Sequence, residues 1–535
     1  MELNDWVLSP GSRNAPITLT FANDSYFNCE SVVDERSAAF IALGKSIVTK
    51  KATVICCTSG SAPLNYSPAI SEAYYQCIPI LVITADRPAK WIDNGEGQSI
   101  NQVNVFSNFC VASHNISSED ELQHIEKVFE EISKNLNQKR KGPIHLNIAF
   151  DEPLYQTTEN PFKVNLNITD VVSTNECNLT ENQIHEWNSY QRILILCGQM
   201  TESEGLLFWL KDLNSDPRVV VLTETISNVR DFQFVNCIDR TISRIRLEID
   251  KPLLVVTLGG AIVSKKIKSL IRSLEKLNHW HVDEFGLSIN VFNKLSNTFS
   301  CPPSSFVRKI VSYNDFTQVS NFKSEWMTAS FIAEERHEQF LKEAKWSDLK
   351  VFKTIVDTMP EGINLHMGNS SVVRYIQLYN PINSITYYGN RGVSGIDGCT
   401  STAVGVASKS DKINLLISGD LSFVYDVNAF WNNISKSNLK VIIINNNGGG
   451  IFRIIPGPQN TGVFEERFEV GNTADIPELC KAHGLEVVSV GEEGALEEAL
   501  VWLYSKSNSA RVIEIITPAT INSDILSSYF LSLNK

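Results

Sequence analysis

Two short polar segments, each at the end of a predicted strand, carry side chains suited to bind a metal ion and a phosphate. Gly419-Asp420 follows the apolar run 413–417, and the segment 445–450 (Asn-Asn-Asn-Gly-Gly-Gly) follows the run 439–444. The carboxyl ends of parallel strands lie on one edge of a sheet, so the Asp and the Asn cluster can meet there. Hard oxygen ligands of this kind suit Mg²⁺, and the glycines let backbone N–H groups approach a phosphate. Each segment alone is typical of an ordinary turn, but the pair indicates a metal–phosphate site.

The elements that position these segments are predicted to be buried parallel strands alternating with helices. Ten apolar runs lack the polar alternation of a half-exposed sheet, as expected of strands covered on both faces. They are residues 53–57, 79–84, 144–149, 192–197, 218–222, 253–258, 363–367, 413–417, 439–444 and 511–516. Apolar residues at spacings of three or four predict helices, most clearly over 122–136 and 495–504. This alternation indicates an α/β fold of parallel, doubly wound sheets.

Length and polar breaks divide the chain into three such units. A chain of 535 residues corresponds to about three or four domains. Polar stretches that contain or follow prolines lie at about residues 151–170 and 312–325. We therefore predict three α/β domains with doubly wound parallel sheets, over residues 1–165, 166–330 and 331–535.

Composition excludes some classes of binding partner and indicates the cellular compartment. The 47 basic and 60 acidic side chains give a net charge of −13, which argues against a surface for nucleic acid or anionic membranes. The longest nearly apolar stretch, 253–263, is shorter than the ~18 residues of a membrane span. The acidic N-terminal segment has no apolar core of a secretory signal. Eleven cysteines without a CxxC pair are typical of reduced thiols, so we expect a cytoplasmic protein.

The metal–phosphate segments resemble the motif of thiamine-diphosphate enzymes. The chain has Gly-Asp-Leu-Ser at 419–422, where most of these enzymes have Gly-Asp-Gly. The form GDLS followed by NNNGG resembles one family within them. These are the 2-succinyl-5-enolpyruvyl-6-hydroxy-3-cyclohexene-1-carboxylate (SEPHCHC) synthases of menaquinone biosynthesis. Further segments follow in the order of that family. They are 8–13, 34–38, 58–61, 84–88, 368–370 and 388–398. The resemblance covers nearly the whole chain and is looser in the middle domain.

The resemblance implies a transferase with pyrimidine-binding, middle and diphosphate-binding domains in that order. It implies decarboxylation of 2-oxoglutarate on thiamine diphosphate and 1,4-addition of the succinyl-semialdehyde carbanion to isochorismate, which gives SEPHCHC and CO₂. It also implies a homodimer or a dimer of dimers, with the active site at the interface of two chains. Family members usually have a whole helix before the segment that matches 8–13. Only eight residues precede Ser9 here, so the alternatives are a trimmed start or a first domain without that helix.

The resemblance also assigns residues to the cofactor. Glu35 would stabilise the imino tautomer of the aminopyrimidine, and an apolar environment would raise its pKa for that role. Mg²⁺ or Mn²⁺ would bind Asp420, the side chain of Asn446 and the carbonyl of Gly448, with Asn447 as the alternative to Asn446. Ile396 would hold the cofactor in its bent shape. The other implied cofactor contacts are Ser394, Gly419, Leu421, Ser422 and Ile451.

Both implied substrates are polyanions, so an acidic protein needs a local cationic pocket for them, and Arg binds carboxylates through two parallel hydrogen bonds. The implied contacts to isochorismate are Ser12, Arg13, Arg87 and Gln98. Those to the carboxylates of donor and acceptor are Ser370, Arg374 and Arg391, the two arginines acting with Glu35 in catalysis. Lys265 and Lys266 match a basic pair of the middle domain, where the family often has Lys-Arg.

Other functions remain as alternatives. Another thiamine-dependent 2-oxo acid decarboxylase, or an acetolactate-type synthase, would lack the forms seen at 8–13 and 445–449. A non-catalytic relative would be signalled by loss of Glu35 or Asp420, and both are present. A nucleotide-binding transferase is disfavoured because the sequence has no complete P-loop motif and no GxGxxG segment after a predicted strand.

Overall fold

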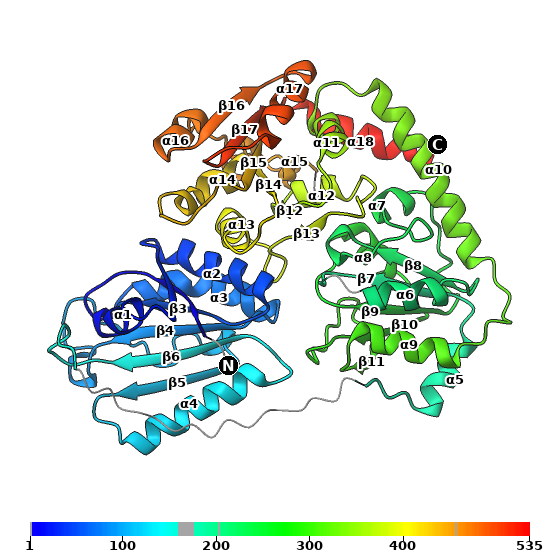
Figure 1. The fold of residues 1–535 in the computed structure, drawn as a ribbon. Helices are drawn as coiled ribbons and strands as arrows, with labels where there is room; N and C mark the ends of the chain where they lie inside the picture. The colour runs from blue at the N-terminus through cyan, green and yellow to red at the C-terminus, as the bar shows by residue number, and fades with distance from the viewer. Residues whose placement is uncertain (1–2, 159–175, 202–203, 455–456) are drawn as a thin grey trace.

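Three α/β units, each built on one parallel sheet, make up the described chain (Figure 1). This computed structural model describes residues 3–158, 176–201, 204–454 and 457–535. Each of the ten predicted runs overlaps a strand of one of these sheets. The predicted α/β fold class is therefore confirmed. In the described ranges, no helix combines the length and apolar character needed to cross a membrane.

The N-terminal unit has a six-stranded sheet in the order β2-β1-β3-β4-β6-β5. Its strands are β1 (Asp5–Leu8), β2 (Asn28–Ser31), β3 (Thr53–Cys57), β4 (Ile80–Asp86), β5 (Ala112–Ser117) and β6 (Pro143–Ala149). Its helices are α1 (Ala15–Ala22), α2 (Glu35–Thr49), α3 (Ala62–Tyr75) and α4 (Leu122–Asn137), with short 3₁₀ turns at Ala89–Trp91 and Ser107–Phe109. The central strands β3 and β4 are completely buried, which explains their mainly apolar sequences. The edge strands β2 and β5 are partly exposed and more polar, so the apolar pattern did not predict them.

The middle unit has a five-stranded sheet in the order β11-β10-β9-β7-β8. Its strands are β7 (Ile193–Cys197), β8 (Val219–Thr223), β9 (Leu253–Leu258), β10 (Leu277–Val282) and β11 (Leu295–Phe299). Its helices are α5 (Glu181–Ser189), α6 (Glu204–Leu213), α7 (Ile238–Thr241), α8 (Lys265–Arg272) and α9 (Pro303–Tyr313), with a 3₁₀ turn at Thr225–Ser227.

A long helix, α10 (Phe322–Glu343), joins the middle unit to the C-terminal unit along one side of the molecule (Figure 1). Phe322 and Trp326 belong to the core of the middle unit, whereas Leu341 belongs to the core of the C-terminal unit. The predicted domain boundary at residues 330–331 therefore falls inside a continuous helix that both units share. The predicted boundary at 165–166 lies outside the described residues.

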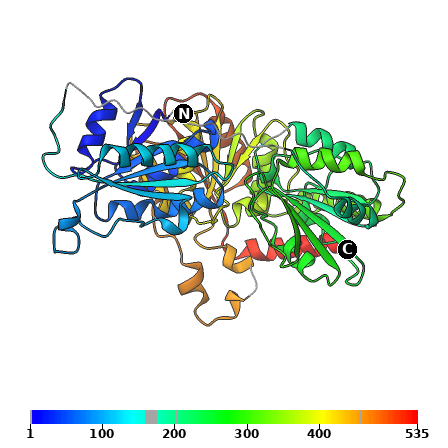
Figure 2. The same ribbon diagram turned by 90° about the horizontal axis from the view of Figure 1, so that it is seen from below.

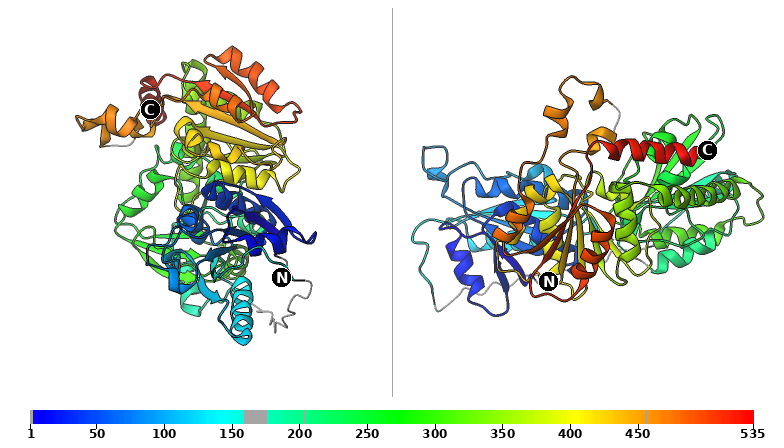
Figure 3. Two further views of the ribbon diagram at one scale, coloured as in Figure 1. Left: turned by 90° about the vertical axis from the view of Figure 1, so that its left-hand side faces the viewer. Right: turned by 90° about the horizontal axis from the view of Figure 1, so that it is seen from above.

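The C-terminal unit has a six-stranded sheet in the order β13-β12-β14-β15-β17-β16. Its strands are β12 (Asn364–Met367), β13 (Thr386–Tyr388), β14 (Asn414–Gly419), β15 (Leu439–Asn445), β16 (Glu486–Val490) and β17 (Arg511–Ile516). Its helices are α11 (Asp348–Thr358), α12 (Val372–Ile376), α13 (Cys399–Ala407), α14 (Asp420–Tyr425), α15 (Ile451–Ile454), α16 (Ile476–Ala482), α17 (Glu493–Tyr504) and α18 (Ile521–Asn534). Shorter turns lie at Val427–Phe430 and Pro458–Asn460, and a π-helix at Glu465–Glu469 projects from the body of the molecule (Figures 2 and 3, orange).

The N-terminal and C-terminal units pack together through α2 and α13, which lie side by side (Figure 1). A Cβ at Gly44 would lie 2.2 Å from the carbonyl oxygen of Thr402, and one at Gly405 would lie 2.1 Å from that of Ile41. Only glycine allows the two helices to approach this closely. The contact fixes the N-terminal end of α2, and with it Glu35, against the C-terminal unit.

Gly405→Ala is expected to lower the free energy of unfolding by about 1–3 kcal/mol, because the added methyl group forces α2 and α13 apart. Urea denaturation followed by circular dichroism measures the change. Gly494→Ala is the matched control, since a Cβ at this position of α17 meets open space and alanine favours the helix. A Gly405→Ala protein that unfolds at the wild-type urea concentration would show that the helices can separate without cost.

Candidate active site

The two predicted metal–phosphate segments meet at one edge of the C-terminal sheet. Strands β14 and β15 are parallel neighbours, with Gly419 opposite Ile444, so Asp420 and Asn445 both lie at the carboxyl ends of the strands. The backbone N–H of Gly448 donates a hydrogen bond to Oδ2 of Asp420, at 2.9 Å. The convergence expected from the sequence is therefore confirmed.

Asp420 is a buried carboxylate without a cationic partner among the described residues. Burial raises its pKa to about 6, against the effect of N–H donors that include Gly448. At Gly448 the φ angle is +126°, and a Cβ there would lie 2.6 Å from the carbonyl oxygen of Val470. A side chain at this position would therefore clash with the segment that covers it, so glycine is required beside the carboxylate.

Asn446 and Asn447, the two alternative metal ligands from the sequence, have different surroundings in the structure. Asn446 is buried, and its Nδ2 donates to Oδ2 of Asp348 at 3.0 Å. The other oxygen of Asp348 accepts a hydrogen bond from Thr517 at 2.6 Å. Asn447, in contrast, is exposed and has a φ of +64°. The amide of Asn446 is therefore held in one orientation by Asp348, a residue that the sequence pattern gave no reason to select.

Glu35 is the first residue of α2 and lies beside the C-terminal unit. Asp34 caps the helix by accepting from the backbone N–H of Ser37 at 3.0 Å, and its Oδ2 accepts from Nδ2 of Asn428 at 2.6 Å. The guanidinium of Arg36 lies over the ring of Tyr425, 4.5 Å from its centre. Glu35 is half-buried, and burial raises its pKa, as does the neighbouring carboxylate of Asp34. The predicted direction of this pKa shift is confirmed.

A loop of the C-terminal unit, residues 391–396, is held by a buried carboxylate of the N-terminal unit. Glu72, on α3, accepts backbone N–H groups of Gly392 at 2.6 Å and Val393 at 2.7 Å. Gln76 donates to Glu72, and Gln199 of the middle unit donates to Gln76 at 2.8 Å. This network joins all three units behind Arg391 and Ser394. Glu72 lies in mid-helix, where nothing in the sequence distinguishes it.

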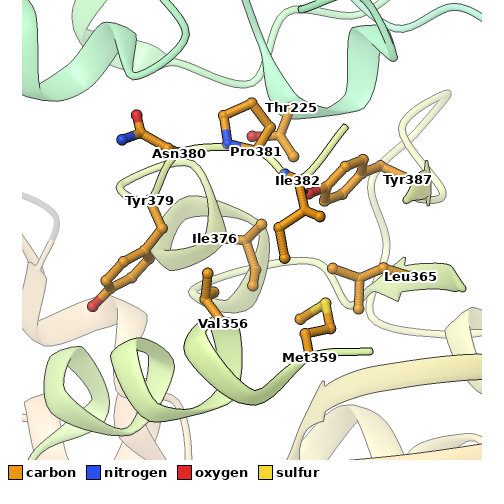
Figure 4. A pocket seen from close by; sticks show the side chains of 10 residues that line it. All are labelled: Thr225, Val356, Met359, Leu365, Ile376, Tyr379, Asn380, Pro381, Ile382 and Tyr387. Atoms are coloured by element: carbon orange, nitrogen blue, oxygen red, sulfur yellow. Dashed lines mark hydrogen bonds between the residues drawn. The ribbon is translucent and has the colours of Figure 1, made fainter. Parts of the chain in front are cut away.

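The same loop borders a cavity of about 230 Å³ between the middle and C-terminal units. Its polar and loop residues include Gly260, Ile262, Lys268, His281, Arg391 and Ser394. Two cations line this cavity, and no carboxylate does. A second cavity, of about 10 Å³, is lined by residues of the C-terminal unit that include Tyr379 and Tyr387, and by Thr225 of the middle unit (Figure 4). It has no charged lining residue and is too small for an organic substrate, so the larger cavity is the candidate substrate site.

The structure places the predicted basic pair of the middle unit outside this cavity. Lys265 is exposed, and the ammonium of Lys266 lies over the ring of Phe530, 2.8 Å from its centre. Burial lowers the pKa of Lys266 to about 8. Lys268, three positions after Lys265 on α8, reaches the cavity instead. In the sequence, the only feature that indicated Lys268 was its place in the basic segment 265–268.

Arg374 and Arg391 lie near one another at the C-terminal side of the cavity. The pKa of Arg374 is lowered by burial and by the charge of Arg391. Nη1 of Arg374 donates to the carbonyl oxygen of Ser370, whose φ is +71°. Nη1 of Arg391 donates to Oδ1 of Asn369 at 2.7 Å, while its Nε is buried without a partner in the described chain. The two guanidinium groups bring two positive charges to this side of the cavity.

The predicted isochorismate contacts gather at the carboxyl edge of the N-terminal sheet. Arg13 is buried, donates to the carbonyl oxygen of Phe150 at 3.0 Å and lies 3.7 Å from the exposed carboxylate of Glu152. Arg87 lies 3.6 Å from the carboxylate of Glu96. Ser12 and Gln98 are exposed. The two arginines are therefore paired with solvent-exposed carboxylates.

The remaining predicted cofactor residues surround the start of α14. Oγ of Ser422 donates to the carbonyl oxygen of Ile396 at 2.6 Å, which ties the loop 391–396 to the helix that begins at Asp420. Ile396 is 40% exposed. Leu421 and Ile451 are half-buried.

Comparison with known proteins agrees with this arrangement. Family models described as the N-terminal TPP binding domain, the middle domain and the C-terminal TPP binding domain of thiamine pyrophosphate enzymes match residues 2–105, 162–367 and 366–515. The SEPHCHC synthase of Flavobacterium johnsoniae is 40% identical over 98% of this chain and 96% of its own length. The chain belongs to the SEPHCHC synthase family.

Other members of the SEPHCHC synthase family show the same coverage. Those of Christiangramia forsetii and Porphyromonas gingivalis are 40% and 33% identical, over 98% of this chain and 95% and 93% of their own lengths. Among solved structures, benzoylformate decarboxylase from Polynucleobacter necessarius matches with a TM-score of 0.71 and 16% identity, over 97% of this chain and 96% of its own. That likeness concerns the fold alone. As a member of the family, the chain is a thiamine-diphosphate-dependent enzyme of the transferase class.

Proposed function

We propose that this enzyme decarboxylates 2-oxoglutarate, adds the resulting succinyl-semialdehyde unit to isochorismate in a 1,4-addition and releases SEPHCHC and CO₂ in menaquinone biosynthesis. Two observations together carry the proposal: the chain matches the family over 98% of its length, and it has a cavity lined by Lys268 and Arg391. A dicarboxylate substrate needs such cations, whereas a monocarboxylate decarboxylase does not.

The residues at the ends of β14 and β15 fit a magnesium or manganese ion that holds a diphosphate. Asp420 is a buried carboxylate that forms no ion pair with any residue the structure describes, and the amide of Asn446 is oriented by Asp348. We propose Asp420, Asn446 and the carbonyl of Gly448 as the metal ligands, a set of oxygen donors that suits Mg²⁺. Gly419, Leu421, Ser422 and Ile451 would line the diphosphate site. Thiamine diphosphate, when bound, supplies the carbon nucleophile and the electron sink for decarboxylation.

The chain's own residues would control protons and charge around that chemistry. Glu35, with its raised pKa, would hold and exchange a proton at the aminopyrimidine nitrogen. Ile396 would support the bent cofactor, and Ser394 would line its substrate side. Arg374, Arg391 and Ser370 would bind substrate carboxylates and stabilise negative charge as it develops. Ser12, Arg13, Arg87 and Gln98 would bind isochorismate, with Lys265 and Lys266 near its path.

We further propose a homodimer or dimer of dimers in which two chains complete each active site. Ile396, Val393 and Tyr425 are exposed apolar side chains beside the candidate site, and a second chain would cover them. A cytoplasmic location is supported by eleven cysteines that are all free.

Loss of isochorismate in the presence of the protein, Mg²⁺, thiamine diphosphate and 2-oxoglutarate tests the proposed function. We expect rapid loss that requires 2-oxoglutarate, with one CO₂ released per isochorismate consumed. Pyruvate in place of 2-oxoglutarate serves as the control for an acetolactate-type enzyme. Turnover of pyruvate, or isochorismate loss that does not depend on 2-oxoglutarate, would reject the proposal.

A further inference from the structure

The segment that carries Arg87 and Gln98, both proposed to bind isochorismate, is fixed at each end by a buried polar side chain. It leaves the sheet of the N-terminal unit after Asp86, the last residue of β4, and ends at Gln102. Asp86 and Gln102 are buried, whereas residues 87–101 are half-buried or exposed. The position of the segment therefore depends on what holds Asp86 and Gln102.

Gln102 joins the segment to the ends of two strands. Its Oε1 accepts the backbone N–H of Gly60 at 2.9 Å, and its Nε2 donates to the carbonyl oxygen of Ala85 at 3.1 Å. A backbone N–H can only donate and a carbonyl oxygen can only accept, so the orientation of this amide is fixed. Its Nε2 also donates to Asn147 at 3.0 Å, and the atom that accepts this hydrogen bond is therefore Oδ1.

Asn147, on β6, is paired across the sheet with Thr84 on β4 and Asn115 on β5. Its Nδ2 donates to Oδ2 of Asp86 and to Oδ1 of Asn115, each at 2.8 Å. Its Oδ1 accepts from the hydroxyl of Thr84 at 2.7 Å as well as from Gln102. Both protons and both acceptor positions of this buried amide are therefore used.

The protons of the remaining groups follow from this amide. Burial lowers the pKa of His145 to about 4, so the ring is neutral near pH 7 and carries one proton. Thr84 gives its only proton to Asn147 and therefore accepts from Nε2–H of His145, at 2.8 Å. Nδ1 of His145 then accepts from the hydroxyl of Ser113 at 3.1 Å. The network thus has one arrangement of protons, set by backbone groups at the Gln102 end.

Asp86 connects this network to the two arginines of the N-terminal unit. Its Oδ1 accepts the backbone N–H of Arg87 at 2.7 Å. Its carbonyl oxygen accepts the N–H of Phe150, whose own carbonyl oxygen accepts Nη1 of Arg13. Burial raises the pKa of Asp86, while its hydrogen bonds and the charges of both arginines oppose that shift. The Nε of Arg87 is buried and has no partner in the described chain, so this guanidinium keeps a donor for an anionic ligand.

Gln98 is held in a strained backbone conformation. Its φ angle is +54°, in the left-handed region that a glutamine rarely adopts. Its carbonyl oxygen accepts from Oγ of Ser59 at 2.9 Å, and a Cβ at Gly60 would lie 3.1 Å from its Cα. Strain of this kind persists only where the surrounding structure determines the conformation. Gln102, which binds the N–H of Gly60, therefore helps to hold Gln98.

Resting on the proposed function, we propose that Gln102 and Asn147 are positioning residues that hold the segment 86–98 in the arrangement that binds the acceptor, isochorismate. Both side chains are buried, so they act through the residues that they bind. Arg374 and Arg391, proposed to bind the donor, are oriented by residues of the C-terminal unit, so the network serves the acceptor alone.

Kinetics with both substrates test this role. Gln102→Met is expected to raise KM for isochorismate about 10–100-fold, because displaced binding groups lose their alignment, and to leave kcat and KM for 2-oxoglutarate within about twofold. Ser59→Ala, a milder change that releases only the carbonyl of Gln98, should raise the same KM about 3–10-fold.

Ser46→Ala is the matched control for these variants. It removes a buried hydroxyl that bonds Thr53 at 2.9 Å, at the start of β3. It should lower the urea midpoint of unfolding, as Gln102→Met does, without changing either KM. An unchanged KM for isochorismate in Gln102→Met, or an equal rise in KM for both substrates, would overturn the proposal.

Hydrogen exchange of the holoenzyme without substrate tests the positioning apart from turnover. Exchange at Gly60 and over residues 97–102 should become at least about 10-fold faster in Gln102→Met, because the buried hydrogen bond is lost, and should stay at the wild-type rate in Ser46→Ala. Wild-type exchange in Gln102→Met would reject the positioning role and leave the proposed function intact. Faster exchange in that variant, with a wild type that does not consume isochorismate, would instead reject the proposed function and keep the role of Gln102 in holding the segment.

Discussion

Asp420→Asn is expected to abolish metal-dependent cofactor binding and to lower turnover by at least about 10²–10³-fold. The substitution keeps the size of the side chain and its contact with the N–H of Gly448, but it removes the one negative charge of the proposed ligand set. Neighbouring groups cannot replace that charge, because Asp348 is turned toward Thr517 and Asn446. The expected defect is therefore in affinity for the metal–diphosphate unit.

Titration of thiamine diphosphate at fixed Mg²⁺, followed by calorimetry, measures this defect apart from catalysis. Asp411→Asn is the matched control, since Asp411 is exposed in the turn that precedes β14. We expect the control to bind and turn over as the wild type does. If Asp420→Asn bound the cofactor with wild-type affinity and the same Mg²⁺ requirement, Asp420 would not be a metal ligand.

Glu35→Gln is expected to retain cofactor binding and to lose activity by about 10²–10⁴-fold, the contribution of a positioned acid–base group. Glutamine preserves the shape and the hydrogen-bonding reach of the side chain but cannot exchange a proton. The raised pKa of Glu35, caused by burial and by Asp34, is the environment that this role requires. Loss of kcat with little change in the cofactor's dissociation constant is the expected signature.

The control for Glu35→Gln changes the first residue of another helix. Glu181 is the first residue of α5, is exposed and lies in the middle unit, so Glu181→Gln removes a charge from a helix start without touching the site. Its activity should equal that of the wild type. Substantial turnover by Glu35→Gln would remove Glu35 from proton exchange and leave it as a residue of the interface between α2 and the C-terminal unit.

The central strands and the polar strand ends could be predicted because their physical causes are local. A strand buried on both faces, such as β9 or β15, is apolar at most positions, and this pattern is visible in the sequence alone. Edge strands such as β2 need no such pattern, because one side faces solvent, and they were missed. The boundary predicted at 330–331 falls inside α10 because this helix packs into the cores of both units. The polar stretch before the helix does not indicate which of its residues belong to which core.

The sequence by itself determined the fold class and the two polar segments that meet at the sheet edge, and its resemblance to a family led to the chemistry proposed for Glu35 and Asp420. Only the tertiary structure decided which polar groups share a space. Lys268 rather than Lys265 reaches the cavity, Asp348 orients Asn446, and Glu72 holds the loop of Arg391. Each of these contacts joins residues that are distant in sequence or depends on the face that a helix presents. Such relations arise from the packing of whole units against one another, which no local pattern of residues records.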